Sequence, residues 1–309
     1  MQTILGANGT IGSILAKELT TYTSTIRLVS RNPKSVNQTD ELFPADVTDS
    51  YQLENAIKGS SIVYLLVGLP YETPIWQKEW PLLMKRTIDA CLKNNAKLVF
   101  FDNVYMYDKA YLNHMTEETP LKPCSKKGEV RTQLVHLIND SIKTKGLKAM
   151  IVRAADFYGP GNDRSMLLEM ALKNVVKGKS AQWLGNLDSI HSFTYTPDAA
   201  KATALLANTE SAYQQVWHLP TSHEKLSVRN LVSLSNEILG SKKSISIIPK
   251  WLIKVLGLFI PIMKELPEMI YQFDRDYFFD SSKFEKEFGI SATSYKDGLL
   301  KTINDLKLN

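Results

Sequence analysis

The sequence predicts an α/β fold built on a doubly wound parallel sheet, and three observations support this fold class. Short apolar runs alternate with amphipathic helical patterns over the first 150 residues, as repeated βαβ units require. A glycine-rich turn at residues 6–12 follows the first apolar run. The run at residues 61–68 is almost continuously apolar, which is typical of a strand covered on both faces.

The same alternation assigns the elements in order along the chain. Strands are expected at 3–5, 25–30, 61–68, 97–103 and 216–219 and at the start of 148–157. A further strand, the third in chain order, is presumed to precede Asp46-Val47 in FPADVTD (43–49). Helices are expected at 10–19, 51–59, 80–94, 125–143, 166–178, 199–208 and 227–240.

The pattern loosens after residue 160, and the C-terminal third is apolar, aromatic and punctuated by proline. This change predicts a smaller, mainly C-terminal α+β lobe. We expect a sheet domain at 1–160 with further contributions around 193–220, and a substrate lobe at 161–192 and 221–309.

Composition excludes several classes of function. The 37 basic and 32 acidic residues are scattered, and a net charge of +5 without a run of like charges disfavours a nucleic-acid surface. The most apolar segment, 251–263, is too short to span a bilayer and contains Lys254. The N-terminus does not resemble a signal peptide, and two cysteines suit a reducing compartment, so we expect a cytoplasmic protein. We expect it to be a monomer or a homodimer. The five histidines show no metal-ligand spacing, and no metal is expected.

The turn GANGTIG has the chemistry of a dinucleotide-binding loop. Glycines let the backbone turn tightly and approach a pyrophosphate, whose charge is then stabilised by a helix N-terminus. Small residues also occur wherever a helix packs closely on a strand, but the position at the first β–α junction favours the binding role. The expected cofactor contacts in the turn are Gly6, Asn8, Gly9, Thr10, Ile11 and Gly12, and those after the strand at 61–68 are Val67 and Gly68.

The residues after the second strand indicate which dinucleotide is preferred. An acid at this point would hold the ribose 2′-hydroxyl of NAD, whereas an arginine accommodates the 2′-phosphate of NADP. The sequence has Ser30-Arg31-Asn32 and no acid there. Arg31 therefore predicts NADP(H) as the preferred cofactor, with NAD(H) possible, unless Arg31 is only a solvated surface side chain. Asp46 and Val47 are placed to contact the adenine.

Six segments in order make the chain resemble the extended short-chain dehydrogenase/reductase superfamily, of the NAD-dependent epimerase/dehydratase type. The resemblance covers nearly the whole chain and implies a Rossmann dinucleotide-binding domain with a substrate lobe. The segments are GANGTIG (6–12), LVFFDNVYMY (98–107), TEETPLKPCSKKGEVR (116–131), VRAADFYGPG (152–161), HSFTYTPDAAKA (191–202) and FDSSKFEKEFG (279–289).

The chain departs from this family at its catalytic Ser-Tyr-Lys set, as the atypical branch of the superfamily does. Asn103 stands where the resemblance implies the Ser, Lys127 where it implies the Tyr, and Arg131 where it implies the Lys. A helical wheel places Lys127 and Arg131 on the apolar stripe of their helix, at its N-terminal end. Arg131 can donate to ribose hydroxyls but cannot release a proton, and Lys127 or Asn103 could stabilise an oxyanion.

Two other uses of these positions stay open. The cations could instead form a structural salt bridge with a carboxylate that the sequence does not identify. A phenol could also come from Tyr105 or from Tyr107, although Tyr107 matches a tyrosine that is usually structural in the family.

Two further departures concern the substrate. The resemblance implies an Asn and an Arg that bind nucleotide sugars, and this chain has Asp156 and His191 instead. An acid repels a diphosphate, and a neutral histidine attracts it less than arginine does. Apolar side chains (Trp80, Trp183, Trp251 and Phe259 among them) could belong to a pocket or to the core. The predicted substrate pocket comprises Tyr71, Trp76, Tyr105, Asp156, Phe157 and His191.

The sequence thus predicts an NADP(H)-binding oxidoreductase or epimerase-like protein that acts on a small, apolar carbonyl or alcohol. The alternative is a non-catalytic sensor or scaffold that binds the dinucleotide. Loss of the Ser and Tyr favours the alternative, whereas the retained C-terminal lobe and its aromatic residues favour an enzyme.

Overall fold

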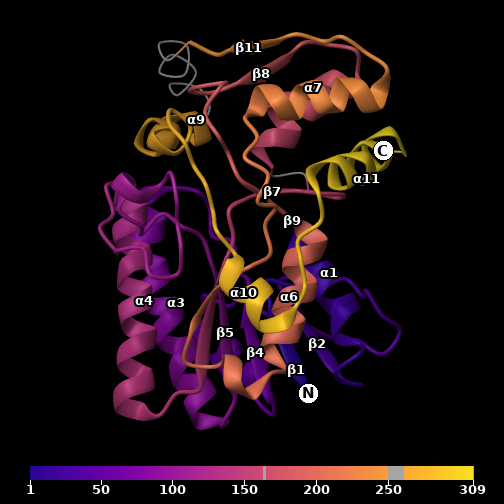
Figure 1. Cartoon of the computed structure of the whole chain (residues 1–309). Helices are drawn as coiled ribbons and strands as arrows, with labels where there is room; N and C mark the ends of the chain where they lie inside the picture. Colours follow the sequence, from indigo (N-terminus) through magenta and orange to yellow (C-terminus); the bar gives the residue numbers. More distant parts are fainter. Residues whose placement is uncertain (163–164, 250–260, 309) are drawn as a thin grey trace. The chain divides into compact units, whose positions relative to one another are not determined.

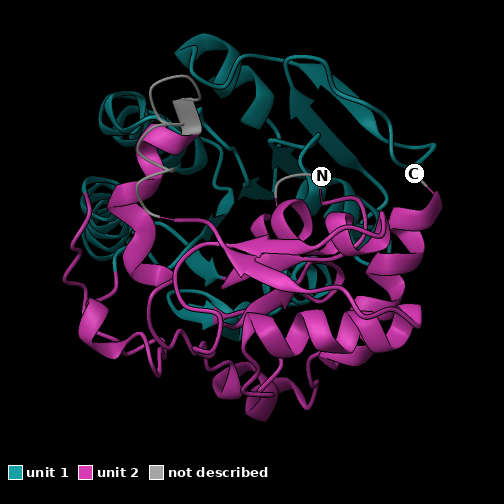
Figure 2. Cartoon of the chain, turned by 90° about the horizontal axis from the view of Figure 1, so that it is seen from above, with its two compact units in different colours: residues 1–106, 126–153, 199–217 teal, residues 107–125, 154–198, 218–309 magenta. Residues whose placement is uncertain are grey.

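The computed structural model describes residues 1–162, 165–249 and 261–308. Trp251, Lys254 and Phe259 lie outside the described residues. The chain divides into two compact units, which Figure 2 colours separately. Unit 1 comprises residues 1–106, 126–153 and 199–217, and unit 2 comprises residues 107–125, 154–198 and 218–309.

Unit 1 is built on a seven-stranded sheet whose order is that of a doubly wound α/β fold (Figure 1). Neighbouring strands from β3 to β6 pair in parallel, and the apolar side chains of β1 and β4 are buried because helices cover both faces. The strands, in spatial order, are β10 (Val216–His218), β6 (Ala149–Arg153), β5 (Lys97–Asp102), β4 (Ile62–Leu65), β1 (Gln2–Leu5), β2 (Ile26–Ser30) and β3 (Glu41–Pro44).

The helices of unit 1 lie on both sides of this sheet. Figure 1 shows α3 and α4 on one side and α1 and α6 on the other, and α2 packs next to α3. The helices are α1 (Thr10–Leu19), α2 (Ser50–Ile57), α3 (Thr73–Lys93), α4 (Lys126–Lys145) and α6 (Thr196–Ala207), with a short 3₁₀ turn at Glu210–Ala212.

Unit 2 has two small two-stranded parallel sheets and most of the C-terminal helices. Its core gathers aromatic and aliphatic side chains from both sheets and from α7, with Trp183 and Tyr295 fully buried. The sheets pair β7 (Asp156–Tyr158) with β9 (Phe193–Tyr195), and β8 (Ala181–Trp183) with β11 (Ile245–Ile247). The helices are α5 (Lys173–Val176), preceded by a π-turn at Leu168–Leu172, α7 (Val228–Leu239), α9 (Pro261–Met269), α10 (Ser282–Phe288) and α11 (Tyr295–Leu308), with 3₁₀ turns at Lys109–Tyr111 and Ile270–Gln272.

The predicted fold class is confirmed, and most predicted elements agree with the structure within a few residues. The largest difference is α3, which was expected at 80–94 but begins at Thr73. Pro74 lies in the first turn, where a missing N–H costs nothing, and Pro81 is accommodated inside the helix. Burial of Trp76 and Trp80 on one face stabilises the extra turns against the proline.

The compact units also divide the chain differently from the predicted domains. Residues 107–125 and 154–160 were expected in the sheet domain, but they group with unit 2. Both segments follow strands of the large sheet at the point where the chain leaves it, after β5 and β6. In the described part of the chain, no helix combines the length and apolarity needed to cross a bilayer.

Candidate active site

The three glycines of the first turn have two different structural roles. Gly6 has a φ of +90°, and a Cβ there would lie 2.8 Å from the carbonyl oxygen of Leu66. A Cβ at Gly12 would lie 2.8 Å from the carbonyl oxygen of Ala7. Packing inside the fold therefore requires glycine at both positions. Gly9 differs, because its φ is −72° and a Cβ would meet only the Gly6 oxygen, at 3.4 Å.

The N-terminus of α1 has the features of an anion site. Gly9 is the N-cap residue and supplies no side-chain acceptor for the N–H groups of the first turn. That turn also contains no acidic residue. Since the first N–H groups of a helix have no intrahelical partner and lie at the positive end of its dipole, this turn fits a pyrophosphate.

Asn8 joins the glycine turn to the loop that follows β2. Its Nδ2 donates to the carbonyl oxygen of Asn32 over 2.7 Å, and its Oδ1 accepts from the backbone N–H of Lys34 over 3.2 Å. The exposed Arg31 lies in the same loop. Hydrogen bonds from Thr48 lower the pKa of Asp46, and the charge of Arg31 adds a smaller effect in the same direction. Because β2 and β3 pair in parallel, Arg31 and Asp46 follow these strands at the same edge of the sheet.

Lys127 and Arg131 lie on the buried face of α4, as the helical pattern predicted. Their exposed fractions are 0% and 6%, and Leu134 and Ile138 continue the same buried stripe. Glu129 and His136 on the opposite face are exposed. The predicted burial of both cations is confirmed.

Aromatic rings enclose the guanidinium of Arg131. Its Cζ lies 4.2 Å from the ring centroid of Trp80, 4.6 Å from that of Trp76 and 5.7 Å from that of Phe100. The negative faces of such rings attract a cation, most strongly where water is excluded. The rings come from α3 and β5, so α3 and α4 are held together partly by this charge.

The carboxylate that the sequence left unidentified is Asp102, the last residue of β5. Arg131 Nη1 lies 3.5 Å from its Oδ1, and Arg153 Nε, at the end of β6, lies 3.6 Å from its Oδ2. Burial raises the pKa of Asp102, whereas the two guanidiniums lower it. One carboxylate thus faces two guanidiniums at ion-pair distances longer than ordinary hydrogen bonds.

Lys127 contacts the segment that follows β4. Its Nζ donates a hydrogen bond to Thr73 Oγ1 over 2.8 Å and lies 4.7 Å from the ring centroid of Tyr71. The Tyr71 hydroxyl donates to the Tyr105 hydroxyl over 3.3 Å. Asn103 Oδ1 accepts from the backbone N–H of Tyr105 over 3.0 Å, so Asn103 shapes the turn that presents Tyr105.

Unit 1 therefore brings together the predicted residues that follow β1, β4 and β5. These strands are adjacent and parallel, so the chain leaves them at the same edge of the sheet. The close approach of Gly6 to Leu66 and Val67 shows directly that the glycine turn touches the segment after β4. A ligand on the glycine turn would lie at the edge that carries Val67, Gly68, Tyr71, Asn103 and Tyr105.

The other three predicted pocket residues, Asp156, Phe157 and His191, belong to unit 2. Asp156 Oδ2 lies 2.9 Å from His191 Nε2, so the two residues that depart from the family pattern contact each other. The His191 ring is buried and stacks on Phe273 and Tyr277, with interplanar angles of 5° and 10°.

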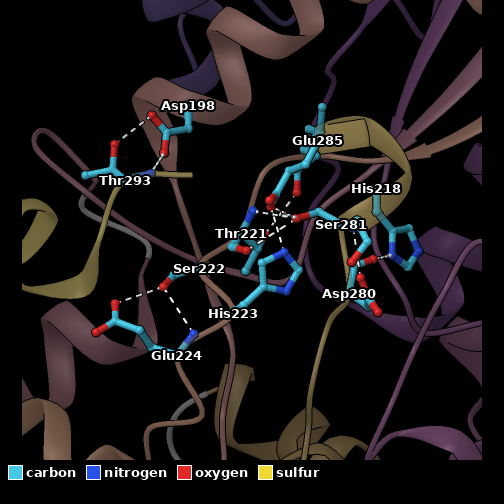
Figure 3. A network of polar contacts seen from close by, with 12 residues as sticks. Asp198, His218, Thr221, Ser222, His223, Glu224, Asp280, Ser281, Glu285 and Thr293 are labelled. Carbon is cyan, nitrogen blue, oxygen red and sulfur yellow. Dashed lines mark hydrogen bonds and ion pairs between the residues drawn. The ribbon is translucent and has the colours of Figure 1, made fainter. Parts of the chain in front are cut away.

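Unit 2 also contains an extended polar network, shown in Figure 3. Ser281 Oγ accepts from the Thr221 N–H over 3.1 Å, and His223 Nε2 lies 2.7 Å from Glu285 Oε1. His218 Nδ1 lies 2.7 Å from the carbonyl oxygen of Asp280. The network joins residues 218–224 to residues 280–285 at the start of α10.

Sequence reasoning missed Asp102, Thr73 and Arg153. Asp102 is a charged residue at the end of an otherwise apolar strand, which was the available signal for a buried ion pair. Thr73 gave no signal because it lies in the part of α3 that was not expected to be helical. Among the described residues, no three His, Cys, Asp or Glu side chains gather as metal ligands.

Comparison with known proteins decides the family. The sequence profile of the NAD dependent epimerase/dehydratase family matches residues 3–218. The chain belongs to this family. The resemblance inferred from six segments is thus confirmed, and the chain is placed in a family of enzymes.

Individual relatives are distant. The chain is 24% identical over 192 residues to the dTDP-glucose 4,6-dehydratase of Shigella flexneri, covering 61% of this chain and 49% of that protein. It therefore matches about half the length of that relative. It is 21% identical over 340 residues to the dTDP-glucose 4,6-dehydratase of Haemophilus influenzae, covering 97% of this chain and 96% of the relative.

Solved structures confirm the fold. The dTDP-glucose 4,6-dehydratase of Bacillus anthracis in complex with NAD has a TM-score of 0.81 at 17% identity, covering 100% of this chain and 96% of the other. The UDP-glucose 4-epimerase of Thermotoga maritima with UDP-glucose has a TM-score of 0.79 at 17% identity, covering 100% and 99%.

Proposed function

We propose that the protein is a nicotinamide-dinucleotide-dependent enzyme that prefers NADP(H) and acts on a small, apolar carbonyl or alcohol. The main support for dinucleotide binding is that packing constrains only two of the three glycines in the turn. Gly6 and Gly12 are required by packing, but Gly9 meets no such constraint and leads into a helix N-terminus that fits an anion. A close approach of a pyrophosphate explains why Gly9 is a glycine.

The preference for NADP(H) rests on Arg31. Asn8 holds the Arg31 loop against the glycine turn, so a dinucleotide on that turn places its adenosine ribose near this loop. A guanidinium pairs well with a 2′-phosphate. Asp46 and Val47 lie along the same edge, where we place the adenine.

Hydride transfer would be supplied by the bound nicotinamide, to or from the substrate carbon. The chain's own residues orient the substrate oxygen and stabilise its charge. Lys127 Nζ, held by Thr73, is a cationic donor at the edge of the sheet where the cofactor turn lies. Arg131 adds a second buried cation, and its predicted contact with ribose hydroxyls remains part of this proposal.

The contact between Asp156 and His191 supports a substrate without a diphosphate. Each uses the other as a hydrogen-bond partner, and stacked aromatic rings cover the imidazole. Stacking on Phe273 and Tyr277 leaves these faces apolar. A small, apolar substrate matches such surroundings better than a nucleotide sugar does.

Cofactor binding tests the proposal directly. NADPH should bind at least several-fold more tightly than NADH in a fluorescence titration, and Arg31→Ala should narrow this difference. Gly9→Ala should weaken both cofactors while leaving the melting temperature nearly unchanged, because its methyl group clashes with the ligand and not with the fold. Equal affinities in the wild type would overturn the preference, and normal binding by Gly9→Ala would overturn the placement of the pyrophosphate.

Substrate class is tested by thermal stabilisation. Ligands that bind only the native state raise the melting temperature by mass action. UDP-glucose and dTDP-glucose at millimolar concentration should leave it unchanged in the presence of NADPH. A clear increase with either one would show that the Asp156–His191 pair does not exclude nucleotide sugars.

One observation also suits a second candidate function, a non-catalytic dinucleotide sensor or scaffold. Arg131 is enclosed by rings and paired with Asp102, as expected for a structural cation. NADPH binding without oxidation by any member of a broad carbonyl panel would favour this candidate.

A further inference from the structure

We propose that Tyr105 is the proton donor of the site. Tyr71 passes a proton back to the Tyr105 phenolate, and Lys127 is the cation that stabilises the Tyr105 phenolate. The inference rests on the proposed function and adds a catalytic residue to it. The family position for the phenol holds Lys127, so an enzyme of this kind needs its acid from another element.

Geometry selects Tyr105 among the tyrosines near the sheet edge. It follows β5 on a turn shaped by Asn103, and its ring stacks on Trp76 with an interplanar angle of 18°. Tyr71 packs edge-on against the same indole, at 5.5 Å between ring centroids. Both phenols are partly exposed, unlike Lys127 and Arg131. A substrate at this edge can therefore reach a phenol more directly than either cation.

The hydrogen bond between the phenols assigns their roles. Tyr71 donates and Tyr105 accepts, so this bond stabilises negative charge on the Tyr105 oxygen. Tyr71 is the positioning residue in this pair, and Tyr105 is the residue that contacts the reacting oxygen.

Two basic side chains also favour negative charge on the hydrogen-bonded pair of phenols. Lys127 Nζ lies over the Tyr71 ring, 4.7 Å from its centroid. Burial lowers the pKa of Arg131, while Asp102, Tyr105 and Tyr71 each raise it, so both phenols lie within electrostatic reach of the guanidinium. Lys127 thus lies beside one member of the hydrogen-bonded phenol pair, and the Arg131 guanidinium favours negative charge on both phenol oxygens, so the protein stabilises the conjugate base of this acid.

The proton balance of a carbonyl reduction is simple. A bound reduced nicotinamide would supply the hydride, with both electrons, that the carbonyl carbon accepts. The O–H bond of Tyr105 breaks, and its proton forms the O–H bond of the product alcohol. The Tyr105 phenolate regains a proton from Tyr71, and water replaces the proton of Tyr71. Oxidation of an alcohol runs through the same steps in reverse.

Tyr107, the other candidate from the same segment, has a different environment. It is fully buried in unit 2, and its hydroxyl lies 2.7 Å from His218 Nε2. The His218 ring is in turn stacked on Phe279 at 3.9 Å between centroids. These contacts give Tyr107 a structural role.

The first test needs no substrate. Subtracting the alkaline absorbance titration of Tyr105→Phe from that of the wild type isolates the ionisation of Tyr105. The titration of Lys127→Met minus that of Lys127→Met/Tyr105→Phe gives the Tyr105 transition without the Lys127 charge. This transition should lie about one pH unit higher than in the wild type, the lower range for losing a nearby opposite charge. Lys127→Arg keeps the charge and should leave the transition near its wild-type position. The exposed Tyr51 provides the matched control, since its ionisation should not respond to Lys127→Met.

The second test measures a single turnover of bound NADPH with ketones and aldehydes. Tyr105→Phe should lower the rate by about 10²-fold or more, the usual share of one positioned acid, while NADPH affinity stays within about twofold. Tyr71→Phe should lower the rate less and shift its pH profile, and Tyr51→Phe should change neither.

The outcomes separate this inference from the proposed function. Failure of the wild type to bind NADPH removes the proposed function. Binding and turnover that survive in Tyr105→Phe overturn the assignment of Tyr105 alone. If no carbonyl reacts, the titration decides, and a Tyr105 transition that ignores Lys127→Met overturns the inference.

Discussion

Asp102 in unit 1, which is buried, and Asp280 in unit 2, which is partly buried, show two ways of holding a carboxylate in a fold. Asp280 is held by hydrogen bonds, because its Oδ1 accepts from the Ser282 N–H and its Oδ2 lies 2.8 Å from His114 Nε2. Asp102 is held mainly by charge, with guanidinium nitrogens at 3.5 and 3.6 Å. The hydrogen bonds of Asp280 stabilise a backbone segment, whereas the ion pairs of Asp102 bring several charged groups close together.

The difference matches the surroundings of each region. The network around Asp280 joins two backbone segments through short polar contacts from several residues (Figure 3). The cluster around Asp102 brings Arg131, Arg153 and, one helical turn away, Lys127 to one edge of a sheet. Buried basic side chains at this edge suit a site where negative charge appears on a substrate or on a phenol.

Removing the carboxylate of Asp102 should have the largest effect. Asp102→Asn removes the carboxylate that faces two buried guanidiniums, and the free energy of unfolding should fall by about 3–5 kcal/mol. Urea denaturation followed by tryptophan fluorescence measures it. Asp89→Asn is the matched control, because Asp89 pairs with Lys145 at the same 3.5 Å separation but is exposed. A comparable loss in both variants would show that burial is not what distinguishes Asp102.

The aromatic rings around Arg131 should contribute less to the free energy of unfolding than the carboxylate of Asp102 does. A double-mutant cycle of Trp80→Leu and Arg131→Met should give a coupling energy of about 1–2 kcal/mol, the range for a desolvated cation over an aromatic ring. The cycle cancels the separate costs of the lost volume. Arg131→Met should be additive with Tyr213→Leu, since Tyr213 packs against Lys97 instead. Additivity in both cycles would show that Trp80 shields Arg131 from water without a cation–π interaction.

Of the three effects on stability, protonation of Asp280 at acid pH should be the smallest. Partial burial opposes the charged form, but hydrogen bonds from Ser282 and His114 outweigh it and lower the pKa of Asp280 to about 2. A carboxyl group whose pKa is lower in the folded than in the unfolded protein stabilises the fold fully above the unfolded value, near 4. This stabilisation is lost as the pH falls from about 4 through 2. The effect is modest because His114 is largely exposed.

The measurement compares stability at two pH values. Asp280→Asn should be less stable than the wild type at pH 7, and the difference should shrink at pH 2.5. Glu237→Gln removes an exposed carboxylate of the same unit and should show little difference at either pH. A deficit of Asp280→Asn that is equal at both pH values would contradict the assigned role of its charge.

Local and periodic features were readable from the sequence alone. The spacing of Gly6, Gly9 and Gly12 after an apolar run identified the β–α turn, because a tight turn near a helix start restricts the residues it accepts. The helical repeat placed Lys127 and Arg131 on one buried stripe, because side chains four residues apart share a face. The alternation of runs also identified the fold class.

The sequence could not show how these features meet. It left open which carboxylate faces Arg131, and the strand order decided this by placing β5 between β4 and β6, so that Asp102 and Arg153 end at the same edge. It gave Tyr71 and Tyr105 as separate pocket candidates, and their contact depends on the pairing of β4 with β5. The contact of Asp156 with His191 likewise depends on the pairing of β7 with β9. Residue periodicity is set by the backbone over a few turns, whereas such partners come from segments far apart in the chain, and only packing brings them within hydrogen-bond distance.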